Sequence, residues 1–220
     1  MPEITFWYSP AACSLAPHVL LHEFGLPFTA CETSVRKGET QTAEFARINP
    51  KKRVPVLSLD GEIITEVPAI ATAIASLAPE RHLMGRTALQ QVRVYEWMNW
   101  LSGTLHGQGF GGVFRPQRFS DRTEVFESIQ AKGRQTVADC FSVIEGKLAG
   151  RHAVGDHFTA VDPYLLVFYR WGNAIGFDMS KSYPGYAQFA QQLVKRESVV
   201  GALAAEGLSD QPLGSPPRQA

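Results

Sequence analysis

Cysteine is scarce in this sequence, and neither sign of charge is in excess. The 220 residues contain only Cys13, Cys31 and Cys140, with no spacing typical of a disulfide scaffold or a zinc site. Lys and Arg together number 21, as do Asp and Glu, so the net charge does not favour nucleic acid or an anionic membrane as a partner. We therefore expect a reduced, cytoplasmic protein that binds no metal.

Long hydrophobic runs and targeting signals are also missing. The longest mostly apolar stretch, Val67 to Ala78, is much shorter than the ~20 residues that a membrane-spanning helix needs. The start of the chain, Met1 to Ile4, has neither the basic nor the apolar region of a signal peptide. We expect no membrane association, and the length suffices for one large or two small domains.

Short β-like and helical segments alternate over the first 80 residues. Period-2 and period-3.6 patterns predict, in order, a strand at 4–8, a helix at 14–24, a strand at 28–33, a helix at 40–48, a hairpin over 54–65 and a helix at 67–77. Asp60-Gly61 is typical of the hairpin turn. The order βαβαββα predicts an α/β domain over 1–80 with a mixed four-stranded sheet, followed by a linker at 78–81.

Residues 86–207 show a helical pattern throughout. Apolar residues at Val94, Met98, Leu101 and Leu105 form one amphipathic stripe, and a second stripe covers 137–148. Gly107, Gly109, Gly111 and Gly112 are expected to break the first helix. Thr159 is expected to cap an apolar helix over 162–175, with Asp162 in its first turn. An all-α domain over 86–207 and a disordered tail at 208–220 follow.

Cys13 is the first candidate for chemistry. It follows a predicted strand and stands at the N-terminus of a predicted helix, where unpaired N–H groups lower the pKa of a thiol. A buried cysteine that only packs is the alternative. Position 16 is Ala16, so there is no C-x-x-C pair, and a reactive Cys13 needs an external thiol.

Three further positions are candidates for binding or catalysis. A cis Val54–Pro55 bond would leave the Val54 backbone free to pair with a peptide-like ligand, whereas a trans proline would open an edge strand. Glu66 is placed either to hold a ligand ammonium or to cap the 67–77 helix. His106 ends a polar helix face and can donate to a thiolate, unless that face is only solvated. Together they describe a ligand with an amino-acid end, a peptide-like middle and a thiol end.

Three stretches together resemble the cytosolic glutathione transferases. They are Tyr8–His18, Asn49–Leu57 and Thr65–Ile70. The thiol at the first turn, with Glu96–Trp100 and His106 downstream, is similar to the bacterial beta class. The resemblance covers about residues 1–207. It implies a thioredoxin-like N-terminal domain, an all-helical C-terminal domain, a homodimer and glutathione as cosubstrate.

The resemblance also implies roles for particular residues. Cys13, Ser14 and His106 would surround the sulfur of glutathione, and the backbone of Val54, before a cis Pro55, would pair with its cysteinyl part. Glu66 and Val67 would hold the γ-glutamyl end. Arg36 or Lys37 would supply charge to the glycyl carboxylate. Asn99 would contribute to the site from the partner subunit.

The expected function is conjugation of glutathione to an apolar electrophile near His106, Phe110 and Phe114. Thiol–disulfide exchange through Cys13 is an alternative enzymatic reading. A non-catalytic binding or interaction protein that reuses the fold is a third. Val67, where the family often has Ser or Gly, and Gly107, where the beta class often has a basic residue, keep this third possibility open.

Overall fold

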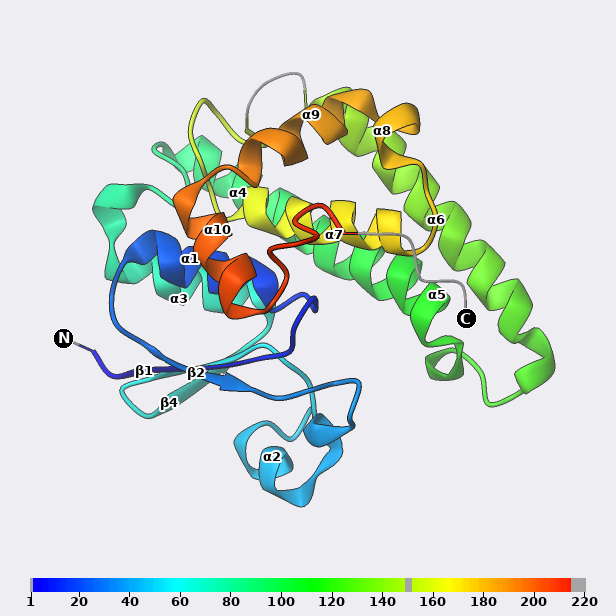
Figure 1. Ribbon diagram of the computed structural model, residues 1–220, viewed down its shortest axis with the longest axis horizontal. Coiled ribbons are helices and arrows are strands. Elements are labelled where there is room, and N and C mark those ends of the chain that lie inside the picture. The colour runs from blue at the N-terminus through cyan, green and yellow to red at the C-terminus, as the bar shows by residue number, and fades with distance from the viewer. Residues whose placement is uncertain (1, 149–151, 215–220) are drawn as a thin grey trace.

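The computed structural model describes residues 2–148 and 152–214, which form an α/β domain followed by a helical domain (Figure 1). In the N-terminal domain the predicted order of elements is confirmed. Its elements are β1 (Ile4–Tyr8), α1 (Leu15–Phe24), β2 (Thr29–Glu32), the 3-10 turn η1 (Glu39–Gln41), α2 (Ala43–Ile48), β3 (Val56–Leu59), β4 (Glu62–Thr65) and α3 (Val67–Leu77).

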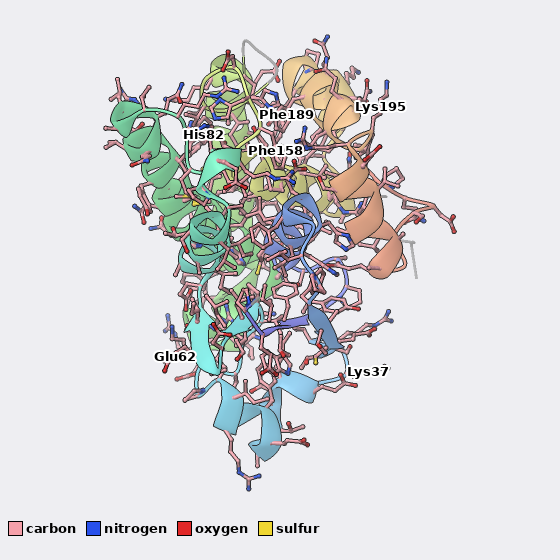
Figure 2. All side chains as sticks on the ribbon, turned by 90° about the vertical axis from the view of Figure 1, so that its left-hand side faces the viewer. Lys37, Glu62, His82, Phe158, Phe189 and Lys195 are labelled. Carbon is pink, nitrogen blue, oxygen red and sulfur yellow. The ribbon has the colours of Figure 1, made fainter. Side chains whose placement is uncertain are left out.

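The sheet is mixed and four-stranded, as the sequence predicts. Its order is β2-β1-β3-β4, with β1 parallel to β2 and antiparallel to β3, and β3 antiparallel to β4. Asp60 and Gly61 both have positive φ, which matches the twist of a tight hairpin between β3 and β4. Figure 2 shows Glu62 and Lys37 toward opposite edges of this sheet.

Both faces of the sheet are covered. In Figure 1, α1 and α3 lie on one face and α2 lies on the other. Under α2, a small cluster of Phe45, Val54 and Val56 is separate from the main core. The main core runs continuously from β1 and α1 into the helical domain, because α1 packs against both α7 and α10. The segment between β1 and α1 therefore lies where the two domains meet.

The C-terminal part is helical, as expected. Its elements are η2 (Pro79–Arg81), α4 (Ala88–Trp100), the π-helical η3 (Leu101–Phe110), α5 (Gly111–Phe114), η4 (Pro116–Arg118), η5 (Thr123–Val125), α6 (Phe126–Lys147), α7 (Val161–Ala174), α8 (Met179–Ser182), α9 (Pro184–Leu193) and α10 (Glu197–Ala205). None of the described helices is long and apolar enough to cross a membrane.

The expected break at the glycines near residue 107 is wrong. The helix begun by α4 continues through η3 and α5 as far as Phe114. The glycines instead permit close packing against α6. A Cβ on Gly109 would lie 2.9 Å from Val137 Cγ2, and one on Gly112 would lie 3.2 Å from the Cα of Gly133. Close approach of two helices needs small residues at the contact, so these glycines serve tertiary packing rather than termination.

The cap of α7 also differs from the expectation. The buried hydroxyl of Thr159 has no hydrogen-bond partner among the described residues. The Asp162 carboxylate instead accepts from the backbone N–H groups of Thr159, at 2.7 Å, and of Ala153, at 2.9 Å. A side chain of the first helical turn therefore accepts from backbone N–H groups that precede the helix. The expectation was the opposite, with the Thr159 side chain accepting from an N–H of the first turn.

The segment expected to be disordered from residue 208 is packed as far as Gly214, and the rest of it lies outside the described residues. Arg170 of α7 donates to the carbonyls of Gln211, at 2.6 Å, and of Pro212. Asn173 donates to the carbonyl of Leu213 at 2.9 Å. The composition of this segment predicted disorder. Its backbone carbonyls are instead ordered as hydrogen-bond acceptors for the buried Arg170.

The contact between α6 and the glycine-bearing helix gives a stability prediction. A Cβ at Gly133 would lie 2.8 Å from Gly109 O and 2.9 Å from Val113 N, so the helices must separate. We expect Gly133→Ala to lower the free energy of unfolding by about 1–3 kcal/mol. Gly146→Ala, on the same helix with no atom within 4 Å, should raise it by about 0.5–1 kcal/mol. Urea unfolding measures both, and equal effects would contradict this account.

Candidate active site at the domain junction

The loop between β1 and α1 carries Cys13 and Ser14. Ser14 is fully buried, and its hydroxyl donates to the Ser9 carbonyl and accepts from the Ser9 N–H, both at 3.1 Å. The Ser14 hydroxyl therefore stabilises the loop by linking its end to the Ser9 backbone. The expected role for the Ser14 side chain beside a ligand sulfur has no support in this geometry.

Cys13 is buried, with 8% of its surface exposed, and its Sγ donates to the Val54 carbonyl at 3.7 Å. Burial raises the pKa of the thiol to about 12, and the nearby positive charge of Arg115 offsets only part of this effect. The expected lowering of the pKa of Cys13 is therefore wrong. At neutral pH the group is a protonated thiol.

Burial accounts for the raised pKa of Cys13, and local backbone bonding limits the contribution expected from the start of α1. The N–H groups of Leu15 and Ala16, which would otherwise face an anion at the start of α1, donate to the carbonyls of Ala12 and Cys13 at 3.1 and 3.2 Å. The first turn of the helix thus satisfies its own donors, and they are not free to stabilise a thiolate.

The Val54–Pro55 peptide bond is cis, which confirms the expectation. The loop before it is fixed by Asn49, whose side-chain amide donates to the Arg53 carbonyl at 2.7 Å. The carbonyl of Val54 faces Cys13. The backbone of Val54 is thus placed beside the one thiol that the sequence marked as a candidate.

Glu66 stands directly before α3 with φ of 73°, outside the conformations that most residues prefer. Its side chain is exposed and pairs with Lys51 Nζ at 2.7 Å. Val67 follows as the buried first residue of the helix. A carboxylate beside the N-terminus of a helix suits a ligand that carries both an ammonium and a carboxylate, although the ammonium must compete with Lys51.

Three polar side chains of the helical domain form a second group. His106 Nδ1 lies 3.4 Å from the Tyr164 hydroxyl, which lies 3.2 Å from Ser102 Oγ. Burial, followed by the charges of Arg115 and Arg118, lowers the pKa of His106 to about 4. Burial also raises the pKa of Tyr164, and the nearby Cys13 acts in the same direction. His106 is therefore a neutral imidazole at pH 7, and this group lies close to Cys13.

Aromatic rings surround His106. Its ring centroid lies 5.1 Å from that of Trp171, which in turn lies 5.7 Å from Phe114. Trp171 Nε1 also donates to the Ala11 carbonyl at 2.8 Å, which joins α7 to the loop that bears Cys13. Phe114 is 47% exposed, but Phe110 is fully buried, so Phe110 supports the site and does not line it as expected.

Lys37 and Asn99 lie outside this group. Both are exposed, Lys37 in the turn before η1 and Asn99 on α4, and their expected roles stay predictions. Sequence reasoning missed Tyr164, whose hydroxyl within a very apolar helix was the available signal, and it also missed Arg115 and Arg118. Among residues 2–148 and 152–214 there is no cluster of His, Cys, Asp or Glu that would hold a metal ion.

Comparisons with known proteins agree over both domains. Residues 11–77 match the family described as "Glutathione S-transferase, N-terminal domain", and residues 109–197 match "Glutathione S-transferase, C-terminal domain". The chain is 32% identical over 206 residues to glutathione S-transferase GstA of Escherichia coli O157:H7, covering 92% of this chain and 98% of that protein.

Two solved structures show the same similarity in three dimensions. A glutathione transferase homologue from Sulfitobacter, with bound glutathione, has a TM-score of 0.88 at 30% identity, over 94% of this chain and 100% of that one. A bacterial beta-class glutathione S-transferase from Sphingomonas chungbukensis has a TM-score of 0.80 at 32% identity, over 93% and 99% of the respective chains.

The raised pKa of Cys13 predicts low reactivity. At pH 7.5 almost none of this group is thiolate, so iodoacetamide should modify the half-buried Cys31 well before Cys13 in the native protein. Peptide mass mapping over a time course measures both rates, and unfolding in guanidinium should make all three cysteines react. Preferential labelling of Cys13 in the native state would contradict the burial argument.

Proposed function

The chain belongs to the glutathione S-transferase family, and we propose that it transfers glutathione, through the thiol sulfur, to an electrophilic carbon of a second substrate. The observation that carries this proposal is the convergence of the two domains on one place. Cys13 Sγ lies 3.7 Å from the Val54 carbonyl, and Ala11 in the same loop accepts from Trp171, which packs on His106 of the helical domain. A ligand that pairs with the backbone of Val54 would therefore lie beside both Cys13 and the aromatic surroundings of His106.

Glutathione fits the N-terminal domain in one direction. Its ammonium would pair with Glu66, its α-carboxylate would meet the backbone at the start of α3 beside Val67, and its cysteinyl amide would pair with the backbone of Val54. Val67 offers no hydroxyl to the α-carboxylate, so only its backbone can serve there. This placement directs the thiol of glutathione toward Cys13 and His106.

The chemistry requires a glutathione thiolate. A protonated Cys13 can donate its S–H to that thiolate, and the neutral imidazole of His106 carries one ring N–H that can do the same. The positive charges of Arg115 and Arg118 favour the anion. The site then stabilises and orients the sulfur for attack on the second substrate.

The alternative of disulfide exchange through Cys13 is not favoured by the structure, since exchange needs a thiolate and burial opposes its formation. The reaction we propose belongs in the cytoplasm, because all three cysteines are free and persist as thiols most readily there. Retention on immobilised glutathione, followed by a conjugation assay, separates a transferase from a protein that only binds.

We also propose that the protein forms a homodimer through α4. Leu89, Val92 and Tyr95 are large, exposed apolar residues at three-residue spacing, so they share one face of the helix. Asn99 continues that face by one further turn. Isologous pairing of two chains along this stripe would bury it and carry Asn99 toward the partner, as its predicted role requires.

The proposed role of Glu66 predicts a loss of affinity on substitution. Glu66→Gln keeps the shape of the side chain but removes the counter-charge for the ligand ammonium. We expect the dissociation constant for glutathione to rise about tenfold, as for a charge-assisted contact of ~1.5 kcal/mol. Isothermal titration calorimetry measures it, with Glu62→Gln on β4 as the matched control. An unchanged affinity in Glu66→Gln would remove this residue from the site.

The dimer proposal predicts the mass in solution. Light scattering at micromolar concentration should give twice the chain mass of 24.2 kDa. Val92→Glu places a charge in the centre of the apolar stripe and should shift the mass toward that of one chain. Glu96→Gln, on the same helix, serves as the control. A mass of one chain for the unaltered protein would refute the dimer.

A further inference from the structure

Three arginines carry positive charge that acts on His106. Arg53, Arg115 and Arg118 form no ion pair with any carboxylate among residues 2–148 and 152–214, although other arginines of the protein do. Their charges all act on His106 to lower its pKa. Like charges gathered in one place oppose folding, so the arrangement calls for an anionic partner from outside the chain.

Backbone geometry places two of these arginines side by side. Arg115 ends α5, and the 3-10 turn η4 follows it, with Arg118 N–H donating to the Arg115 carbonyl at 3.0 Å. Arg115 caps the start of this turn and Arg118 is its last residue, so the two arginines lie one turn apart. Pro116 is buried and fixes the start of the turn. The two arginines are therefore carried by one short, hydrogen-bonded turn.

The third arginine approaches from the other domain. Arg53 is held through its carbonyl by Asn49, and it directly precedes Val54, whose carbonyl contacts Cys13. The charges of Arg115 and Arg53, after burial, lower the pKa of Arg118 to about 10. Arg53 therefore adds positive charge from the N-terminal domain, one residue before the carbonyl that contacts Cys13.

Exposed aromatic surface lies next to the arginine pair. Phe114, adjacent to Arg115, packs its ring against Trp171, which contacts His106. Phe119, adjacent to Arg118, is also exposed. An aromatic ring can pack on Phe114 and Trp171 while a planar anion attached to it accepts hydrogen bonds from a guanidinium.

We propose that Arg115 and Arg118 bind the carboxylate of an aromatic second substrate, so that this enzyme prefers anionic aromatic electrophiles to neutral ones. This inference rests on the proposed function, because it assigns a substrate class to the same site. Arg53 completes the positive surface from the N-terminal domain.

A pair of chloroarenes provides the probe. In 4-chloro-3-nitrobenzoate a carboxylate replaces one nitro group of 1-chloro-2,4-dinitrobenzene. In both, the glutathione thiolate forms a C–S bond at the carbon that bears chlorine, and chloride leaves with the electron pair of the broken C–Cl bond. The proton of the glutathione thiol passes to solvent. The reaction is redox-neutral and needs no further reagent.

The measurement is the ratio of kcat/KM for the benzoate to kcat/KM for the neutral compound, taken in each variant relative to the unaltered enzyme. This comparison cancels the different intrinsic reactivity of the two compounds. Arg118→Gln and Arg115→Gln should each lower the ratio at least tenfold. Arg122→Gln, an exposed arginine beyond η4 that contacts Glu124, is the matched control and should leave the ratio unchanged. A ratio that does not change in Arg118→Gln and Arg115→Gln would overturn the proposal.

A second arm identifies the source of the carboxylate. If the arginines bind the glycyl carboxylate of glutathione instead, Arg118→Gln will raise the KM for glutathione but not for glutathione monoethyl ester, whose glycyl carboxylate is blocked. That result would also overturn the proposal. The expected result is the same KM change, within error, for both thiols.

Binding of the product separates this inference from the proposed function. Calorimetry compares S-(4-carboxy-2-nitrophenyl)glutathione with S-(2,4-dinitrophenyl)glutathione in the unaltered protein and in Arg118→Gln. If neither chloroarene reacts but the carboxylated conjugate binds more tightly in an Arg118-dependent way, the transferase proposal fails and the anion site stands. If both compounds react and the carboxylated conjugate has no Arg118-dependent advantage, only the anion site fails.

Discussion

Glu206, buried just after α10, accepts hydrogen bonds from the Ala11 backbone N–H and from His18 Nδ1, each at 2.9 Å. Burial raises the pKa of this carboxyl, and the two donors oppose that shift. Leaving a buried donor or acceptor without a hydrogen-bond partner lowers the stability by about 1–3 kcal/mol per group. Loss of the Glu206 side chain would leave two such donors unpaired. One side chain near the end of the sequence thus fixes both the loop before Cys13 and the helix after it.

The loop is held by the helical domain on its other side as well. Ala11 has φ of 61°, its N–H is bound by Glu206, and its carbonyl accepts from Trp171. The position of Cys13 therefore depends on both domains. The same tryptophan packs on His106, so the loop and the aromatic lining of the site share one support. Separate folding of the N-terminal domain would leave this loop without its two main contacts.

Local patterns were sufficient to predict much of the fold. The order of elements along the N-terminal domain, the mixed sheet, the Asp60–Gly61 turn and the long helices follow from periodicity and turn chemistry, which act over a few residues. The glycines after residue 106 misled this reasoning, because their effect depends on Gly133, which is distant in sequence. Helix propensity describes an isolated helix, whereas these glycines are selected by a contact between two helices.

The site was predictable in outline only. Glu66, Val54 and His106 stand at element boundaries that a sequence reveals, but the pKa of Cys13 depends on burial, which local position does not give. Tyr164 and the arginine pair reach the site only through the packing of α5 and α7. The cis bond before Pro55 was expected from the resemblance to a family, not from local chemistry.

The segment 208–214 has no helix or strand, yet its carbonyls are the acceptors for the guanidinium of Arg170 in the middle of α7. That arginine is buried, with only 5% of its surface exposed, and burial lowers its pKa to about 10. A chain shortened to the last regular helix would look complete in a topology diagram and would leave a cation buried without acceptors. Domain boundaries drawn from secondary structure alone would therefore cut away part of the helical domain's interior, and any fusion or tag is better joined beyond Gly214.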